Sequence, residues 1–230
     1  MIGIIGAMEE EVAILIKKME IETEVSKASM IFYKGVLCNK EVVVVKSGIG
    51  KVNAASCAQI LIDIFKVDTL INTGIAGSLD AKINIGDIVI SSDSLHHDMD
   101  ARLFGYDIGQ VPRMNTLAFP ANEILVNKAK EANELVNPDI NTFVGRVVSG
   151  DQFIADKDVK NNIIQNFNGM CTEMEGAAIA HVAYLNNISY VIIRAISDKS
   201  DDSATVDYPV FEKQAIVHSV RLVENLLTRI

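Results

Sequence analysis

Short, strongly apolar runs recur along the chain and have the composition of β-strands. Val42–Val45 and Tyr190–Ile193 are continuously apolar, which is typical of strands buried on both faces of a sheet that helices cover. The predicted strands are Ile2–Gly6, Met30–Val36, Glu41–Ser47, Thr69–Gly74, Asp87–Ser92, Thr142–Ser149 and Tyr190–Ser197.

Segments with helical periodicity alternate with these strands. Ala54, Ala58, Leu61 and Phe65 recur at the spacing that places them on one helix face. A C-terminal set repeats this spacing, and three further helices are predicted: Ile216, Val220, Val223 and Leu227, then Asn122–Leu135, Asp156–Phe167 and Glu175–Asn186. The alternation predicts an α/β fold in which helices flank a central mixed, mostly parallel sheet.

The chain shows no boundary at which a second domain would begin. It has no Pro/Ser-rich linker, no low-complexity run and no repeat at the period of a solenoid. Residues 1–230 are therefore expected to form one domain. The longest irregular region runs from His96 to Pro120, and long loops in compact domains are often functional.

The charge of the chain narrows the classes of partner. The formal net charge is −9 over 230 residues. A surface of this sign disfavours a nucleic-acid backbone and an anionic membrane, because both are polyanions. It leaves small nucleosides open, since they carry no phosphate.

Cysteine usage predicts a reducing, cytoplasmic compartment. Cys38, Cys57 and Cys171 are scattered, odd in number and form no CxxC motif. We expect no signal peptide, because Met1 is followed directly by an apolar run and then by Glu9–Glu11, without a basic region. No apolar run reaches the ~18 residues that a membrane-spanning helix needs.

Carboxylates border three apolar segments that are far apart in the sequence. They are Glu9–Glu11, Glu173 with Glu175, and Asp198. Each has a structural explanation: acidic residues stabilise helix N-termini, a Glu can cap a helix, and Asp198 can be an N-cap. Helical spacing also allows one residue of Glu9–Glu11 to face a pocket while its neighbours face solvent. If the three segments converge, they supply an acid, a base and an anchor for hydroxyl groups.

Other motifs argue against phosphate loops and metals. Ser47–Val52 lacks the upstream Gly and the Ser/Thr of a Walker motif, so we interpret it as a tight turn between a strand and a helix. Asn72–Ser78 is interpreted as a Gly-rich turn after a buried strand. His96 and His97 are adjacent and have no spaced partner, so the histidines predict no metal site.

Taken together, these segments resemble the nucleoside phosphorylase/hydrolase superfamily and, more closely, its branch of bacterial 5'-methylthioadenosine/S-adenosylhomocysteine nucleosidases. The resemblance spans nearly the whole chain in the family's order. The matching segments are Ile2–Val12, Ser47–Val52, Ile71–Gly74, Phe104–Tyr106, Gly109–Gln110, Val148–Asp151 with Phe153–Ile154, Glu173–Glu175 and Arg194–Asp198. It implies a nucleoside phosphorylase-like fold and hydrolysis of the N-glycosidic bond of adenine nucleosides that carry a 5'-thio substituent.

The resemblance implies specific roles for the carboxylates. Glu11 matches the base that activates water, and Asp198 matches the acid that protonates adenine at N7. Glu175 matches the residue that binds the ribose hydroxyls, with Met174 packed against the sugar, and Ser197 would orient Asp198. The implied reaction requires neither a metal nor an organic cofactor.

The resemblance also implies how a nucleoside is held. Phe153 would stack on adenine and the Ile154 backbone would hydrogen-bond its edge. Apolar walls would line the sugar and its 5' substituent, and a loop from a second subunit would complete the 5' pocket of a homodimer. The walls are assigned to Met8, Ile49 and Tyr208, and the partner-subunit loop to Phe104, Tyr106 and Pro112. Ile75 is counted among the substrate-binding residues, near the adenine or the sugar. Ile75 stands where several family members carry Ser, and Tyr208 where related chains carry Phe.

Three other functions remain open at this point. A purine nucleoside phosphorylase would need cationic or amide-rich groups for phosphate, whereas the first loop carries Glu9–Glu11, so hydrolysis is expected. A second alternative is a hydrolase that prefers 6-amino-6-deoxyfutalosine. The third is a non-catalytic nucleoside-binding or sensor protein, against which the combination of Glu11, Glu175 and Asp198 argues.

Overall fold

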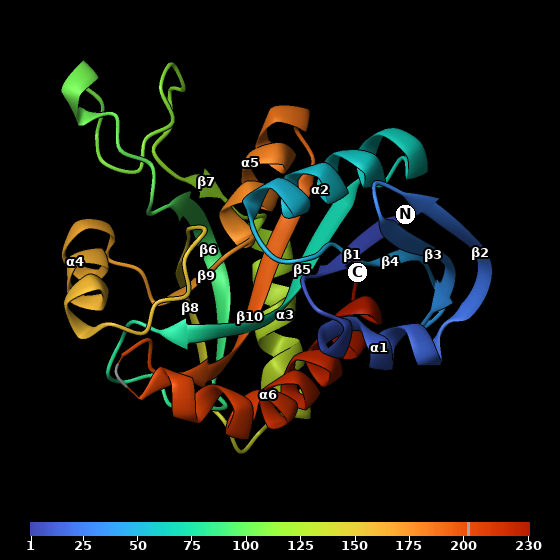
Figure 1. Cartoon of the computed structure of the whole chain (residues 1–230). Helices are drawn as coiled ribbons and strands as arrows, with labels where there is room; N and C mark the ends of the chain where they lie inside the picture. Colours follow the sequence, from blue (N-terminus) through green and yellow to red (C-terminus); the bar gives the residue numbers. More distant parts are fainter. Residues whose placement is uncertain (202) are drawn as a thin grey trace.

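A mixed β-sheet forms the centre of the fold (Figure 1). The computed structural model describes residues 1–201 and 203–230, without the side chains of Val206, Tyr208 and Pro209. Within these residues the strands are β1 (Ile2–Gly6), β2 (Glu20–Lys27), β3 (Met30–Leu37), β4 (Lys40–Lys46), β5 (Thr69–Ser78), β6 (Ile88–His96), β7 (Phe119–Pro120), β8 (Thr142–Ser149), β9 (Cys171–Glu173) and β10 (Ser189–Asp198).

Helices cover both faces of this sheet. They are α1 (Glu9–Lys18), α2 (Lys51–Phe65), α3 (Glu123–Val136), α4 (Lys157–Phe167), α5 (Gly176–Asn186) and α6 (Ala204–Leu227), with a short 3-10 turn at Arg102–Phe104. Side-chain caps begin two of them: Asn122 accepts hydrogen bonds from two backbone N–H groups of α3, and Asp156 does the same for α4. The predicted α/β class with a mixed sheet is confirmed.

The strand pairings place parallel strands in the middle and close part of the sheet into a ring. β1 pairs in parallel with β4 and β5, and β5 pairs in parallel with β10. β10 then pairs with β6, β6 with β8, β8 with β9, and β9 returns to the end of β5. Side chains at the carboxyl ends of β5, β9 and β10 are therefore brought close together.

Two apolar layers hold five of the six helices to the sheet, and α4 packs through a third, smaller cluster that contains Ile163 and Phe167. Helices α2 and α5 pack on one face through residues such as Leu61 and Ile179, against Ile192 of β10. Helices α1, α3 and α6 pack on the other face, where Val12 and Val220 meet the apolar side chains of β1, β5 and β10. The alternating orientation of strand side chains supplies both layers from the same strands.

The predicted Gly-rich turn at Asn72–Ser78 is wrong, because these residues continue β5. The glycines do not reverse the chain; they allow other side chains to approach the backbone of β5 closely. A Cβ on Gly74 would overlap the Glu11 carboxylate and lie 2.9 Å from Arg194 Nη1, and a Cβ on Gly77 would overlap Ser200 Oγ. Glycine inside a strand commonly marks such a place, where another group crosses the backbone.

The strand β2 was not predicted, and its composition explains why. It lies at the margin of the sheet and pairs only with β3 among the described strands. Its side chains are mostly exposed and include Glu20, Glu22 and Glu24. Polar residues of this kind protect an edge strand from pairing with other chains, but they remove the apolar pattern by which a strand is recognised.

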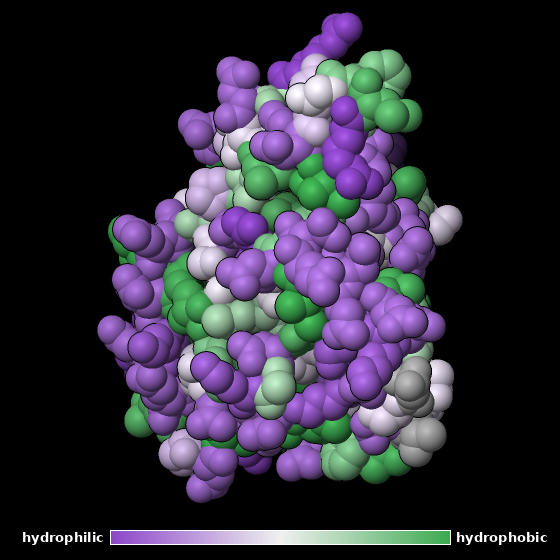
Figure 2. Space-filling model, turned by 90° about the vertical axis from the view of Figure 1, so that its left-hand side faces the viewer, coloured by the Kyte–Doolittle hydropathy of each residue, from purple (hydrophilic) through white to green (hydrophobic). Residues whose placement is uncertain are grey.

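The expected irregular region after β6 projects from the body of the molecule (Figure 1). Leu103 and Phe104 are 99% and 83% exposed within it. Figure 2, which views the molecule from this side, shows hydrophobic surface where the segment projects. Among the described residues, no helix combines the length and the apolar character needed to cross a membrane.

Gly74→Ala is expected to lower the free energy of unfolding by about 1–3 kcal/mol, because the added methyl group overpacks the site where Glu11 and Arg194 cross β5. The matched control is Gly145→Ala in β8, where the three atoms nearest to a Cβ all belong to the flexible side chain of Met170. Urea denaturation of both variants measures the difference. Equal stabilities for the two variants would contradict the packing argument.

Candidate active site

A cavity of about 470 Å³ opens where β1, β5, β9 and β10 end. Its walls combine apolar side chains with carboxylates from widely separated parts of the sequence. The described lining residues are Ala7, Met8, Glu11, Ile49, Ile75, Ala76, Gly77, Phe153, Thr172, Glu173, Met174, Glu175, Ser197, Asp198 and Thr205. Several convergent polar groups in an otherwise apolar pocket are typical of a small-molecule site.

Glu11 is the member of Glu9–Glu11 that faces inward. It is buried, whereas Glu9 and Glu10 are exposed, as the helical spacing predicted. One carboxylate oxygen accepts hydrogen bonds from the backbone N–H groups of Ala7 and Met8, at 2.6 and 3.0 Å, and the other accepts from Ile75 at 3.1 Å. Burial raises the pKa of Glu11, although the charge of Arg194 and these three hydrogen bonds oppose the shift.

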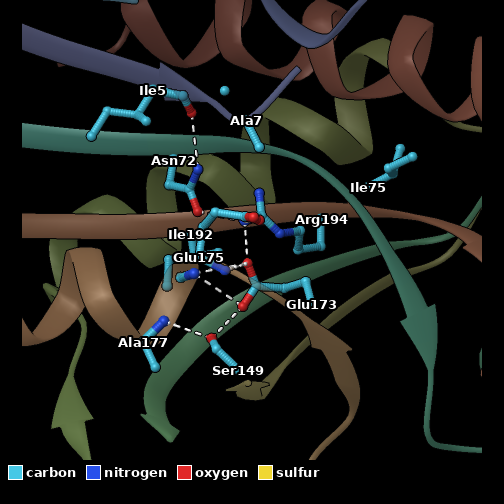
Figure 3. A network of polar contacts seen from close by, with 12 residues as sticks. Ile5, Ala7, Asn72, Ile75, Ser149, Glu173, Glu175, Ala177, Ile192 and Arg194 are labelled. Atoms are coloured by element: carbon cyan, nitrogen blue, oxygen red, sulfur yellow. Dashed lines mark hydrogen bonds and ion pairs between the residues drawn. The ribbon is translucent and has the colours of Figure 1, made fainter. Parts of the chain in front are cut away.

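Arg194 is a fully buried cation in the middle of β10, and Figure 3 shows it together with Glu173 and Glu175. The charge of a third carboxylate, Glu11, also acts on it. Arg194 Nη2 donates to the side-chain oxygen of Asn72 at 2.6 Å and forms an ion pair with Glu173. Glu173 also accepts hydrogen bonds from Ser149 Oγ and from the Gly176 backbone N–H at the start of α5. Burial opposes ionisation of Glu173, but Arg194 and these hydrogen bonds hold its pKa below the usual range.

The electrostatic interaction of Glu175 with Arg194 is weaker than that of Glu173. One of its oxygens lies 4.0 Å from Arg194 Nη2, and the other accepts from the Gly50 backbone N–H at 2.7 Å. Burial and the neighbouring charge of Glu173 raise the pKa of Glu175 to about 8. The pKa values of the two neighbouring glutamates are therefore shifted in opposite directions, so that at neutral pH Glu173 favours the ionised form and Glu175 the protonated form.

Asp198 ends β10 at an irregularity in the pairing with β5. Such bulges re-aim side chains and are frequent beside active sites. The carboxylate accepts from Ser197 Oγ at 2.9 Å and from the Ser200 backbone N–H at 2.8 Å, and it crosses Gly77 of β5. Burial raises the pKa of Asp198 despite these two hydrogen bonds, which favours a carboxyl group that can carry a proton.

A polar clamp joins the loops at the mouth of the cavity. The ammonium group of Lys51 lies 2.6 and 2.7 Å from the two oxygens of Asp98. The same carboxylate accepts from the backbone N–H of Asp151, whose side chain in turn accepts from the backbone N–H of Lys51 at 2.8 Å. The clamp holds the turn that carries Ile49 against the loop that carries Phe153.

Most residues predicted for the site lie together in this cavity. Of the predicted residues, those that line it are Met8, Glu11, Ile49, Ile75, Phe153, Met174, Glu175, Ser197 and Asp198. Ile154 lines a smaller adjoining pocket of about 40 Å³, which Phe153 and Asp198 also border. The side chain of Tyr208 lies outside the described residues, although its backbone belongs to α6.

The residues assigned to a partner subunit are not brought to the cavity. Phe104, Tyr106 and Pro112 all belong to the projecting segment between β6 and β7. Phe104 and Pro112 are exposed and Tyr106 is half-buried. Their position is compatible with contact to a second molecule.

The sequence analysis assigned no role to Arg194, Asn72, Ser149, Thr172 or Thr205. Arg194 nevertheless had a signal in the sequence, because it interrupts the apolar run Ile192–Ile196 of a strand predicted to be buried. A buried arginine is rare unless it is paired, so its presence predicts carboxylate partners nearby. Asn72 and Ser149 gave no comparable signal.

Comparisons with known proteins place this geometry among known enzymes. The family described as Phosphorylase superfamily matches residues 1–229. A 5'-methylthioadenosine/S-adenosylhomocysteine nucleosidase of Staphylococcus aureus (strain bovine RF122 / ET3-1) is 44% identical over the full length of both chains.

Two solved structures share the fold over nearly their whole length. The 5'-methylthioadenosine/S-adenosylhomocysteine nucleosidase of Neisseria meningitidis, in complex with methylthio-immucillin-A, has a TM-score of 0.96 at 37% identity and covers 100% of this chain and 99% of its own. The futalosine hydrolase of Helicobacter pylori has a TM-score of 0.93 at 30% identity, with coverages of 100% and 97%.

Glu175→Gln is expected to flatten the pH dependence of stability. Because the pKa of Glu175 is about 8 in the fold and 4.5 ordinarily, the folded protein binds more protons than the unfolded chain between these values. The free energy of unfolding therefore falls as the pH rises from about 5 to about 8, and this group contributes a slope approaching about 1.4 kcal/mol per pH unit.

Urea denaturation at several pH values measures this slope in the wild-type protein and in Glu175→Gln, whose amide cannot titrate. Glu10→Gln is the control, because Glu10 is exposed. If the slopes of wild-type protein and Glu175→Gln were the same, the assignment of a retained proton to Glu175 would be wrong.

Proposed function

This chain belongs to the phosphorylase superfamily and, within it, to the 5'-methylthioadenosine/S-adenosylhomocysteine nucleosidases, so it is an N-glycosidase of adenosyl thioethers, and we propose that Asp198 and Glu11 carry out the hydrolysis. The observation that carries the proposal is the convergence of both carboxyl groups on one cavity. Both groups are buried and both pKa values are raised, which suits proton transfer near neutral pH.

In the proposed reaction Asp198 acts as the acid. The glycosidic C–N bond breaks and its electron pair moves into the purine, while the Asp198 carboxyl donates its proton to N7. Adenine thus leaves as a neutral base. Ser197 Oγ and the Ser200 backbone N–H fix the carboxyl group, so the proton is presented in one direction.

Glu11 acts as the base in the same reaction. Its carboxylate takes a proton from water, whose oxygen forms the new bond to the sugar carbon and yields the thioribose product. The backbone N–H groups of Ala7, Met8 and Ile75 fix this carboxylate without neutralising it. Their hydrogen bonds stabilise the ionised form and so offset part of the cost of burying a charge.

The charge balance of the site favours water over phosphate as the nucleophile. The sugar becomes positively charged in the transition state, and surrounding carboxylates stabilise that charge. The described residues that line the cavity include four carboxylates and no lysine or arginine. Arg194 lies behind them, already paired with Glu173. A phosphate dianion would enter a site of its own sign.

The remaining contacts are assigned by position in the cavity. We propose that Phe153 stacks on adenine, that the Ile154 backbone hydrogen-bonds its edge, and that Glu175 binds the ribose hydroxyls beside Met174. Met8, Ile49, Ile75 and Tyr208 would form the walls around the sugar and its 5' substituent. Phe153 and Ile49 are 51% and 53% exposed, as expected of side chains that a ligand covers.

A homodimer and a cytoplasmic location are parts of the same proposal. The exposed Phe104 on the projecting segment supports a role, with Tyr106 and Pro112, in the 5' pocket of a second subunit. The three cysteines are unpaired, which supports a reducing compartment.

A preference for 6-amino-6-deoxyfutalosine is the second candidate. The similarity to a futalosine hydrolase at 30% identity favours it as a competing substrate specificity of the same site. Competition between this nucleoside and methylthioadenosine measures the ratio of their kcat/KM values and decides between the two.

Purified protein is expected to release adenine from methylthioadenosine in phosphate-free buffer, and added phosphate should not increase the rate. Chromatography of free adenine measures the rate of its release with and without phosphate. Turnover that requires phosphate would make the protein a phosphorylase, and tight adenine binding without turnover would make it a binding protein.

Asp198→Asn and Glu11→Gln are each expected to lower kcat by roughly 10²–10⁴-fold, because each removes one proton-transfer group while keeping its shape. Binding of adenine, measured by calorimetry, should persist in Glu11→Gln. Glu10→Gln is the matched control, since it lies next to Glu11 on α1 but points to solvent. Wild-type kcat in either active-site variant would remove that residue from the mechanism.

A further inference from the structure

The orientation of the Asp198 carboxyl group depends on the turn that follows it. Of the two hydrogen bonds that it accepts from described residues, one comes from the Ser200 backbone N–H, at 2.8 Å. Ser200 is buried and has a positive φ of 51°, a left-handed conformation that costs a non-glycine residue about 1–2 kcal/mol. A conformation of this kind persists only where the surrounding structure holds it.

The Lys160 side chain contacts this turn at the two residues that flank Ser200. Its ammonium group donates a hydrogen bond to the backbone carbonyl of Lys199 and lies 3.5 Å from a carboxylate oxygen of Asp201. The Lys160 side chain is only 14% exposed, so solvent weakens these contacts less than those of a surface pair. On the other side, the Lys199 ammonium group donates to the carbonyl of Ile83.

Because Lys160 belongs to α4, its contact with the turn also links the turn to this helix. Lys160 lies in the first turns of α4, and α4 follows directly after the loop that carries Phe153 and Ile154. Asp156 caps the helix through the N–H groups of residues 158 and 159 and fixes where it begins. One ammonium group therefore connects the loop beside the adjoining pocket to the turn that aims Asp198.

We propose that Lys160 is a positioning residue that ties the turn at Lys199–Asp201 to α4 and thereby holds the Asp198 carboxyl group in line with the leaving purine. The inference rests on the proposed role of Asp198 as the acid. Lys160 touches neither the cavity nor the reacting atoms, so its contribution lies in the geometry of proton transfer. Small errors in such geometry are costly, since a displacement of about 1 Å can lower a rate by about 10²-fold.

The test compares Lys160→Met with Lys160→Arg and Lys157→Met. Methionine keeps the apolar length of the side chain but makes neither polar contact, whereas arginine keeps the charge. Lys157 lies on the same helix and is exposed, which makes it the matched control. Steady-state hydrolysis of methylthioadenosine gives kcat and KM for each variant, at a temperature well below the melting temperature of that variant.

Lys160→Met is expected to lower kcat by about tenfold or more while KM changes by less than about threefold, because proton transfer is misaligned and ground-state binding is kept. Lys160→Arg should recover kcat to within about threefold of the wild-type value, and Lys157→Met should match the wild type. Because a smaller fraction of folded protein would also lower the apparent kcat at unchanged KM, kcat is calculated on the concentration of folded protein, which circular dichroism and urea denaturation give for each variant.

Three results would overturn the inference: a Lys160→Met kcat within about twofold of the wild type, an equal loss in Lys157→Met, or an arginine variant as slow as the methionine variant. If the wild-type protein itself releases no adenine, the proposed function fails together with the inference. If the wild-type protein is active and Lys160→Met is equally fast, only the role of Lys160 fails.

Discussion

The buried guanidinium of Arg194 is the constraint on which the rest of the site depends. Glu11, Glu173 and Glu175 lie around it in a region from which water is largely excluded. Three buried carboxylates without a cation would repel one another and carry the full cost of desolvation. One arginine is too little to neutralise them all, so the site keeps an excess of negative charge, and the direct ion pair with Glu173 leaves Glu175 to take up a proton.

The backbone around this ion cluster is shaped to admit it. Gly74 and Gly77 remove the side chains that would otherwise occupy the space of Glu11, Arg194 and Asp198 where these cross β5. The ring closure of the sheet brings the ends of β5, β9 and β10 together, and the irregularity at the end of β10 turns Asp198 toward the cavity. The chemistry is thus built on strand ends and on the first turns of the helices that follow them.

The sequence predicted the fold class, because long apolar strands and amphipathic helices dominate it, whereas most of the residues that line the cavity were assigned through the family resemblance. Glu11 and Asp198 were identifiable as carboxylates at the borders of such segments, and the family resemblance supplied their roles. The edge strand β2 was missed because its exposed glutamates hide the strand pattern. Asn72–Ser78 was taken for a turn because glycine also marks close approach, which only tertiary contacts reveal. The contacts of Lys160 with Lys199 and Asp201 join residues that are far apart in the sequence, so no local sequence pattern predicts them.

The retained proton on Glu175 has a thermodynamic consequence for ligand association. A ligand hydroxyl that donates to this side chain favours the ionised form, whereas one that accepts from it favours the protonated form. Binding is therefore linked to exchange of a proton with the bulk solution. The heat measured on complex formation then depends on the ionisation enthalpy of the buffer, and affinities determined in different buffers are comparable only at equal pH.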